Sequence, residues 1–231
     1  MKKVKVIIFI VALIIGLAFA KVFGAVLGFS LPTVSIFSSI KGSGVIKTEK
    51  RELAGFKKIE VSGAIEVEIN AQKDFSVDVE ADDNLLEYVK TEVDGDTLKI
   101  YTKSRIWKHN KIRVVISMPE LTEADVSGAS KITANNIKTD SFKIDVSGAS
   151  KIEVNGEAKD LKIEASGASK INAENLKVAK ADVDISGATS VTVNATEEVK
   201  AEASGARKIN YFGEPKNVIK DVSGASKVSQ K

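Results

Sequence analysis

A short motif, Ser-Gly-Ala, recurs through this chain and constrains its fold more than any other feature. The last six of its seven copies begin 18 to 20 residues apart. A fixed period of this size indicates stacked supersecondary units, each packed only against its neighbours. The glycines of the seven copies are Gly63, Gly128, Gly148, Gly167, Gly187, Gly205 and Gly224.

Each repeat predicts two short strands that meet at this glycine. In the copy that begins at Ser147, Ile144 and Val146 flank the acidic Asp145, and Ile152 follows five residues after the serine. Apolar residues at every second position are typical of a strand with one buried face. We expect the glycine to form a bend, because it accepts backbone angles that other residues avoid. The seven glycines are therefore predicted to stack along one edge.

A second corner is expected eight residues after the repeat serine, where asparagine recurs. Asparagine tolerates the left-handed conformation and bonds its own backbone in turns. A return segment of variable length, such as residues 155–160, then leads to the next repeat. Two strands, two corners and a return in about 19 residues describe one coil of an all-β parallel solenoid, whose equivalent residues form ladders about 4.8 Å apart. The corner asparagines are Asn70, Asn135, Asn155 and Asn194.

The start of the chain predicts export. Three lysines within the first five residues precede an apolar run that begins at residue 6, resumes after Lys21 and ends at residue 31. A basic start followed by an apolar helix is typical of a signal segment, and the total length approaches the roughly 20 residues that span a bilayer. We expect residues 6–31 either to remain as a membrane anchor or to be removed by cleavage after Ala20. In both cases the rest of the chain lies outside the cytoplasm.

Two further segments follow residues 1–31, the signal or anchor segment. The part after Pro32 contains Ser38, Ser39, Gly42, Ser43 and Gly44, which indicates a linker. An Asp94-Gly95 pair between two short strand patterns predicts a hairpin, and residues 84–88 are suited to a short helix or turn. The predicted segments are a linker over 32–54 and a β-helix head over 55–228, which divides into an elaborated opening region over 71–120 and regular Ser-Gly-Ala coils over 121–228.

Several motifs occur in an order that resembles a known family. They are Phe56-Lys57-Lys58-Ile59-Glu60-Val61-Ser62-Gly63-Ala64, then Asp83-Asn84-Leu85-Leu86, then Val93-Asp94-Gly95-Asp96-Thr97-Leu98-Lys99-Ile100, then repeated Val-Ser-Gly-Ala-Ser. Together they resemble the bacterial family described as "putative auto-transporter adhesin, head GIN domain" over about residues 55–228. The resemblance implies a right-handed single-stranded β-helix on an exported protein and supplies no catalytic residues. The chain departs from the pattern where Thr189 and Arg207 replace the second serine and Glu174 replaces the corner asparagine.

The composition excludes several kinds of chemistry. The chain has 34 basic and 31 acidic residues, which argues against dedicated nucleic-acid binding. It has no cysteine, so disulfides, thiolate metal sites and cysteine nucleophiles are excluded. The single histidine, His109, lacks the spacing of a catalytic triad and is expected in a loop, beside a Trp107 that is able to stack on a sugar. We predict no catalytic residue, no cofactor and no metal ligand.

Two charged ladders are the repeated polar surface of the predicted solenoid. Like charges about 4.8 Å apart repel by nearly 1 kcal/mol even in water, so each ladder needs compensation. Because both ladders flank the same bend, we expect them to compensate each other. The acidic ladder is Glu60, Asp125, Asp145, Glu164, Asp184, Glu202 and Asp221, and the candidate ligand ladder is Lys131, Lys151, Lys170, Lys208 and Lys227.

These patterns favour a non-catalytic cell-surface module, adhesin-like or specialised for an anionic or zwitterionic polymer of the cell envelope or its surroundings. A repeated strip suits a long polymer, since weak contacts add along it. The alternative is a carbohydrate-active β-helix enzyme, a polysaccharide lyase or hydrolase. One regular acid per coil argues against that alternative, because such hydrolases need an unequal carboxylate pair in a cleft.

Overall fold

The structure, a computed structural model, describes residues 39–107, 110–205 and 207–231. Within these ranges the chain is all-β and contains no helix. The strands are β1 (Ile40–Lys41), β2 (Ile46–Arg51), β3 (Lys58–Gly63), β4 (Glu66–Ala71), β5 (Ser76–Asp82), β6 (Val89–Asp94), β7 (Thr97–Thr102), β8 (Ile106–Trp107), β9 (Arg113–Met118), β10 (Glu123–Gly128), β11 (Lys131–Gly148), β12 (Lys151–Gly167), β13 (Lys170–Gly187), β14 (Ser190–Gly205), β15 (Lys208–Phe212), β16 (Asn217–Gly224) and β17 (Lys227–Gln230).

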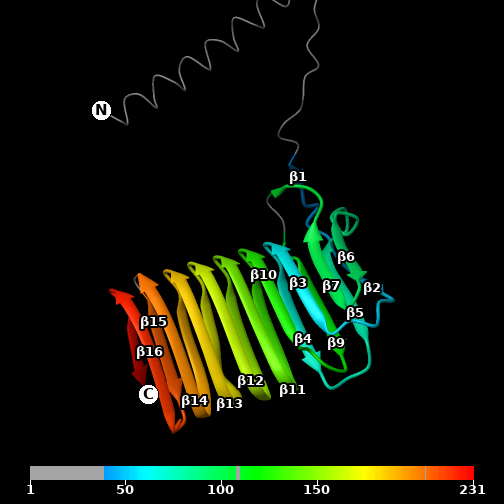
Figure 1. Ribbon diagram of the computed structural model, residues 1–231. Coiled ribbons are helices and arrows are strands. Elements are labelled where there is room, and N and C mark those ends of the chain that lie inside the picture. The colour runs from blue at the N-terminus through cyan, green and yellow to red at the C-terminus, as the bar shows by residue number, and fades with distance from the viewer. Residues whose placement is uncertain (1–38, 108–109, 206) are drawn as a thin grey trace, which may run out of the picture. The chain divides into compact units, whose positions relative to one another are not determined.

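Parallel coils stacked side by side form a solenoid from β3 to β17 (Figure 1). The register places each repeat on its copy in the next coil, so that Ser127 pairs with Ser147 and Ser147 with Ser166. Apolar positions of the template stack in the interior, where Ile144, Ile163 and Val183 are fully buried. The predicted β-solenoid with internal apolar ladders is confirmed.

The return segment of each coil differs from the prediction. We expected a variable connection, but β11, β12, β13 and β14 each run through nearly a whole coil without a break. Gly156, in the expected return segment, pairs with Ile137 of the coil before it. Stacking in parallel supplies backbone partners to this segment whatever its side chains are, so it becomes strand.

The bend orients alanine outward and serine inward. Gly148 adopts a φ of 124°, after which Ala149 is exposed and Ser150 is buried. The Ser150 hydroxyl donates to the carbonyl of Gly128 at 3.3 Å and accepts from the amide of Ser130 at 3.2 Å. These bonds satisfy a polar group inside an apolar solenoid and link consecutive coils. Similar hydroxyl bonds to a bend glycine are made by Ser130, Ser169, Thr189 and Ser226.

We call these stacked inward hydroxyl residues the serine column, and Arg207 is the exception in it. It occupies the same template position, is 7% exposed, and has no hydrogen-bond partner for Nε or Nη1 among the described residues. Its guanidinium group lies against Gly205. The regular stacking of serine hydroxyls on bend carbonyls is therefore interrupted at this coil.

The second corner also differs from the prediction. Left-handed angles occur at Asn136 and Gly156, one residue after the expected Asn135 and Asn155. The two expected asparagines instead form a ladder, in which Asn155 donates to the side-chain oxygen of Asn135 at 2.7 Å and Asn135 donates to Asn70 at 3.3 Å. Their role is to join coils through side chains rather than to turn the backbone.

The opening region adds antiparallel strands to the first coil. The predicted hairpin at Asp94-Gly95 is confirmed, since β6 and β7 pair antiparallel across it. Residues 83–88 form turns. The expected linker over 32–54 contains β1 and β2, and β2 pairs antiparallel with β5. Arg51, at the end of β2, donates to the carbonyls of Val89 and Leu86 at 2.7 and 3.0 Å, which fixes this strand although its sequence is polar.

The expected signal or anchor segment, its cleavage position after Ala20 and His109 lie outside the described residues. In the part of the chain that is described, no helix is long and apolar enough to cross a membrane.

Candidate functional site

The acidic ladder lies in register along β3, β10 to β14 and β16. Asp125 pairs with Glu60 on one side and with Asp145 on the other, and the series continues through Glu164. Carboxylates are thus neighbours in consecutive parallel strands, as the repeat predicts.

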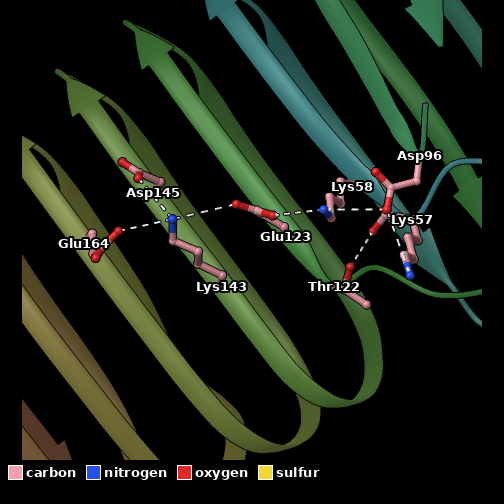
Figure 2. Close-up of polar contacts among 8 residues, drawn as sticks. All are labelled: Lys57, Lys58, Asp96, Thr122, Glu123, Lys143, Asp145 and Glu164. Atoms are coloured by element: carbon pink, nitrogen blue, oxygen red, sulfur yellow. Dashed lines mark hydrogen bonds and ion pairs between the residues drawn. The ribbon is translucent and has the colours of Figure 1, made fainter. Parts of the chain in front are cut away.

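A different lysine column compensates this ladder. Lys143, two residues before Asp145, places its ammonium 3.1 Å from a Glu164 oxygen, 3.4 Å from Asp145 and 3.8 Å from Glu123 (Figure 2). Lys58 continues the chain of charges, 3.7 Å from Glu123. Further along, Lys162 and Lys200 bind Glu164 and Glu202 at 2.9 and 2.7 Å. The expected compensation of the acids by the candidate ligand ladder is therefore wrong, because lysines on the same strands lie closer.

The compensation is uneven, and the pKa values of the acids differ accordingly. Although Asp125 is exposed, desolvation by the surrounding protein raises the pKa of its carboxyl above the ordinary value, and the carboxylates of Asp145 and Glu60 raise it further. Hydrogen bonds from Lys162 and Lys143 lower the pKa of Glu164. The ladder consequently contains one acid that disfavours ionisation and one that is stabilised as a carboxylate.

The candidate ligand ladder is exposed and continuous apart from one gap. In register, Lys131 pairs with Lys151 and Lys151 with Lys170. Ser190 then takes the position, and Lys208 and Lys227 follow. All five lysines are exposed.

Only the first lysines of this ladder are neutralised by acids. Lys131 binds Glu66 at 2.7 Å, and Lys151 binds Glu153 at 2.8 Å. Among the described residues, Lys170, Lys208 and Lys227 form no ion pair. The positive charge of the ladder is therefore concentrated in the C-terminal coils.

A row of neutral polar side chains runs beside these lysines, two positions further along each strand. Asn172 pairs with Thr192, Thr192 with Asn210, and Asn210 with Ser229. We call the combined surface the lysine face. The sequence contains a signal for this row that we did not use, namely a polar residue six positions after each of the last six repeat serines. The lysine face consists of Lys170, Asn172, Ser190, Thr192, Lys208, Lys227 and Ser229, whereas Asn210 of the same row is buried.

The hollows on the rest of the surface are open and mixed in charge. One of about 580 Å³ is lined by acids and lysines of the return segments, including Glu120, Lys138, Glu157 and Lys159. Among the residues that the structure describes, no three histidine, aspartate or glutamate side chains gather so as to hold a metal ion. Trp107 lies on β8 and is 62% exposed. These features do not assemble the unequal carboxylate pair that a glycoside hydrolase requires.

The fold and its ladders define a class, the β-solenoid with a repeated charged surface and a hydrogen-bonded serine column. The chain belongs to the family described as "Putative auto-transporter adhesin, head GIN domain", whose model matches residues 55–215. This confirms the resemblance that the motifs indicated. Comparison with curated proteins gives no match.

Solved structures share this fold at low sequence identity. A putative adhesin from Bacteroides fragilis is 18% identical, with a TM-score of 0.73, over 84% of this chain and 100% of that one. A putative adhesin from Parabacteroides merdae is 21% identical, with a TM-score of 0.57, over 84% and 99%. A putative lipid binding protein from Parabacteroides distasonis is 21% identical, with a TM-score of 0.51, over 84% and 100%. The family description and these names refer to adhesins and lipid binding, and to no enzyme.

Proposed function

We propose that this protein is a non-catalytic cell-surface module that binds an anionic polymer of the cell envelope or its surroundings along the lysine face. One observation carries the proposal: Lys170, Lys208 and Lys227 lie in one register column, interrupted only by Ser190, and form no ion pair among the described residues. Lys208 and Lys227 lie on adjacent coils, about 4.8 Å apart, and Lys170 is two coils from Lys208. A chain of regularly spaced anionic groups matches such a row, and its contacts add through effective concentration.

The neutral row supports the same interpretation. Asn172 and Thr192 are half-buried and carry donors and acceptors two positions beyond the ladder positions Lys170 and Ser190, as recognition of hydroxylated polymers requires. The family's adhesin description agrees with a surface location. No observation on the described residues favours the enzyme alternative.

Export and membrane retention through residues 6–31 complete the proposal, with release after Ala20 as the alternative. N-terminal sequencing of the protein from cells separates the two, since released protein begins at Lys21.

We also infer that the coil is right-handed, because crossovers between parallel strands in one sheet are almost always right-handed.

Paired substitutions in one ladder test polymer binding. Lys170→Gln with Lys208→Gln removes two free charges, whereas Lys131→Gln with Lys151→Gln removes two charges that Glu66 and Glu153 already neutralise. We expect the first pair to weaken retention on an immobilised polyuronate and on isolated cell-wall material, and to flatten its dependence on salt. The second pair should change retention much less.

Equal loss from both pairs would indicate general charge rather than the lysine face. Unchanged retention of a folded Lys170→Gln, Lys208→Gln protein would refute the proposal. Folding should be nearly unaffected, because exposed charges contribute little to stability. Turnover of an acidic polysaccharide that a single acidic substitution abolishes would instead support the enzyme alternative.

A further inference from the structure

A second exposed surface lies far from the lysine face in sequence, on the small sheet of β1 and β8 (Figure 1). Its two strands pair Ile40 with Ile106 and Lys41 with Trp107. Trp107 is 62% exposed, the largest exposed fraction among the big apolar side chains of the described residues. An indole presented to solvent offers a partner a large apolar ring together with an N–H donor.

Hydrogen bonds hold this surface in place. The side chain of Asn84 donates to the carbonyl of Lys41 at 2.9 Å and accepts from the amide of Ser43 at 2.9 Å. Asp82, which is 1% exposed, accepts at 2.6 Å from the side chain of Asn110, just beyond β8. The turn at residues 82–84 therefore fixes both the segment that carries β1 and the segment that follows β8.

The exposed side chains beside the indole are basic. Lys103, Arg105 and Trp107 are exposed while Ser104 and Ile106 between them are half-buried, and Lys41 pairs with Trp107. Within the described ranges, neither these two lysines nor Arg105 makes an ion pair. We call Lys41, Lys103, Arg105 and Trp107 the basic indole patch. Acids of the neighbouring turn are limited to the bonded Asp82, to Asp83, which lies 3.7 Å from Lys47, and to Glu87.

We propose that the basic indole patch docks on the anionic membrane surface from which the chain emerges. Tryptophan prefers the headgroup level of a bilayer, where its ring is partly buried and its N–H remains hydrogen-bonded. Each lysine or arginine near an anionic leaflet adds electrostatic attraction. The patch therefore combines the two features that recognise a lipid surface.

The position of the patch in the chain favours this partner. Only residues 32–39 separate the apolar segment from β1, and eight residues reach at most about 29 Å. A membrane anchor would thus hold the patch near the headgroups at high effective concentration. The inference depends on the membrane retention proposed above and is independent of polymer binding by the lysine face.

The single tryptophan of the chain makes the test direct, since intrinsic tryptophan fluorescence reports only Trp107. The full chain is reconstituted with the head outward in vesicles of phosphatidylcholine, with or without phosphatidylglycerol. We expect phosphatidylglycerol to shift the emission to shorter wavelength and to protect the indole from acrylamide added outside. Lys103→Gln with Arg105→Gln should lower the ratio of docked to undocked molecules about 30-fold.

Lys170→Gln with Lys208→Gln is the matched control, because it removes two charges from the lysine face and should leave the fluorescence response unchanged. Equal acrylamide quenching in both kinds of vesicle would overturn the proposal. A shift produced by added polysaccharide and not by phosphatidylglycerol would assign Trp107 to sugar stacking instead. Protein isolated from cells that begins at Lys21 would remove the anchor on which docking depends, whatever the polymer-binding result.

Discussion

Single residues at the bend determine how closely the coils approach. Gly148 has a φ of 124°, and a Cβ at this position would collide with the carbonyl of Gly128 in the preceding coil. Gly63 has a similar φ of 112°, but a Cβ there would meet only the Thr102 hydroxyl at 3.8 Å. The two glycines therefore share the conformational requirement and differ in the space available.

This difference predicts unequal effects of the same substitution. Gly63→Ala should destabilise the protein by about 1–2 kcal/mol through left-handed strain alone. Gly148→Ala should cost about 1–3 kcal/mol more, because the added methyl group forces two coils apart. Urea denaturation of both variants measures the difference. Equal midpoints would show that close stacking does not constrain this column.

At the scale of the strands, the acidic ladder predicts opposite responses to pH. The raised pKa of Asp125 means that folding favours its neutral form. The contribution of Asp125 to the free energy of unfolding is complete below the pKa that this side chain has in the unfolded chain. It is lost as pH rises through the pKa that the side chain has in the folded protein. Asp125→Asn should therefore raise the melting temperature at pH 7 and have little effect at pH 3.

Glu164 provides the matched control with the opposite sign. Lys162 and Lys143 lower the pKa of Glu164 in the folded protein. Its contribution to the free energy of unfolding is therefore present above the pKa that it has in the unfolded chain, and is lost as pH falls through the pKa that it has in the folded protein. Glu164→Gln should lower the melting temperature at pH 7 and have less effect in acid. Shifts of the same sign for both variants at pH 7 would contradict the assigned environments.

The strands also show how far the sequence predicts the fold. Period-two patterns identified the interior positions, such as Ile152, and the shared glycine identified the bend, because both repeat at every coil. The compensating lysine column was missed because Glu123 and Asp182 interrupt it, so it has no single residue type. Its ion pairs depend on register, which is known only when the strands are paired.

Corners were harder to predict than strands for a similar reason. The bonds between Asn155 and Asn135 use the same residue type that turns commonly use, so composition does not distinguish the two roles. The repeat spacing predicts that Glu174 replaces a corner asparagine, but a register shift pairs Asn155 with Asn175 instead. For the candidate site, the repeat predicts the lysine ladder. It does not predict which lysines of the ladder form no ion pair.

At the scale of the whole described unit, the two ends of the solenoid differ. At the N-terminal end, β7 pairs with β3 of the first coil, and the opening region contains the buried Leu85 and Leu86. At the other end, β16 pairs only with β14 and β17 only with β15 among the described strands. An exposed parallel edge of this kind is a template for pairing with another chain.

A charged residue, Lys220, lies in the last full strand at this open end. It pairs with Ala201 at a position that is apolar or small in the other coils, and its ammonium lies 5.4 Å from the centre of the Tyr211 ring. A charge at an inward position opposes the addition of another coil, because pairing would bury it. Adding a further coil would therefore bury the charge of Lys220 in the last coil.

Removing this charge should allow the open ends to associate. We expect Lys220→Val to increase the sedimentation coefficient of the detergent-solubilised full chain as its concentration rises. Lys216→Val is the control, because it removes an exposed charge from the neighbouring turn and leaves the inward position unchanged. If Lys220→Val and the unsubstituted chain sediment alike at every concentration, then another feature of the last coil keeps the edge free. Association confined to Lys220→Val would identify the inward lysine as the group that ends the stack.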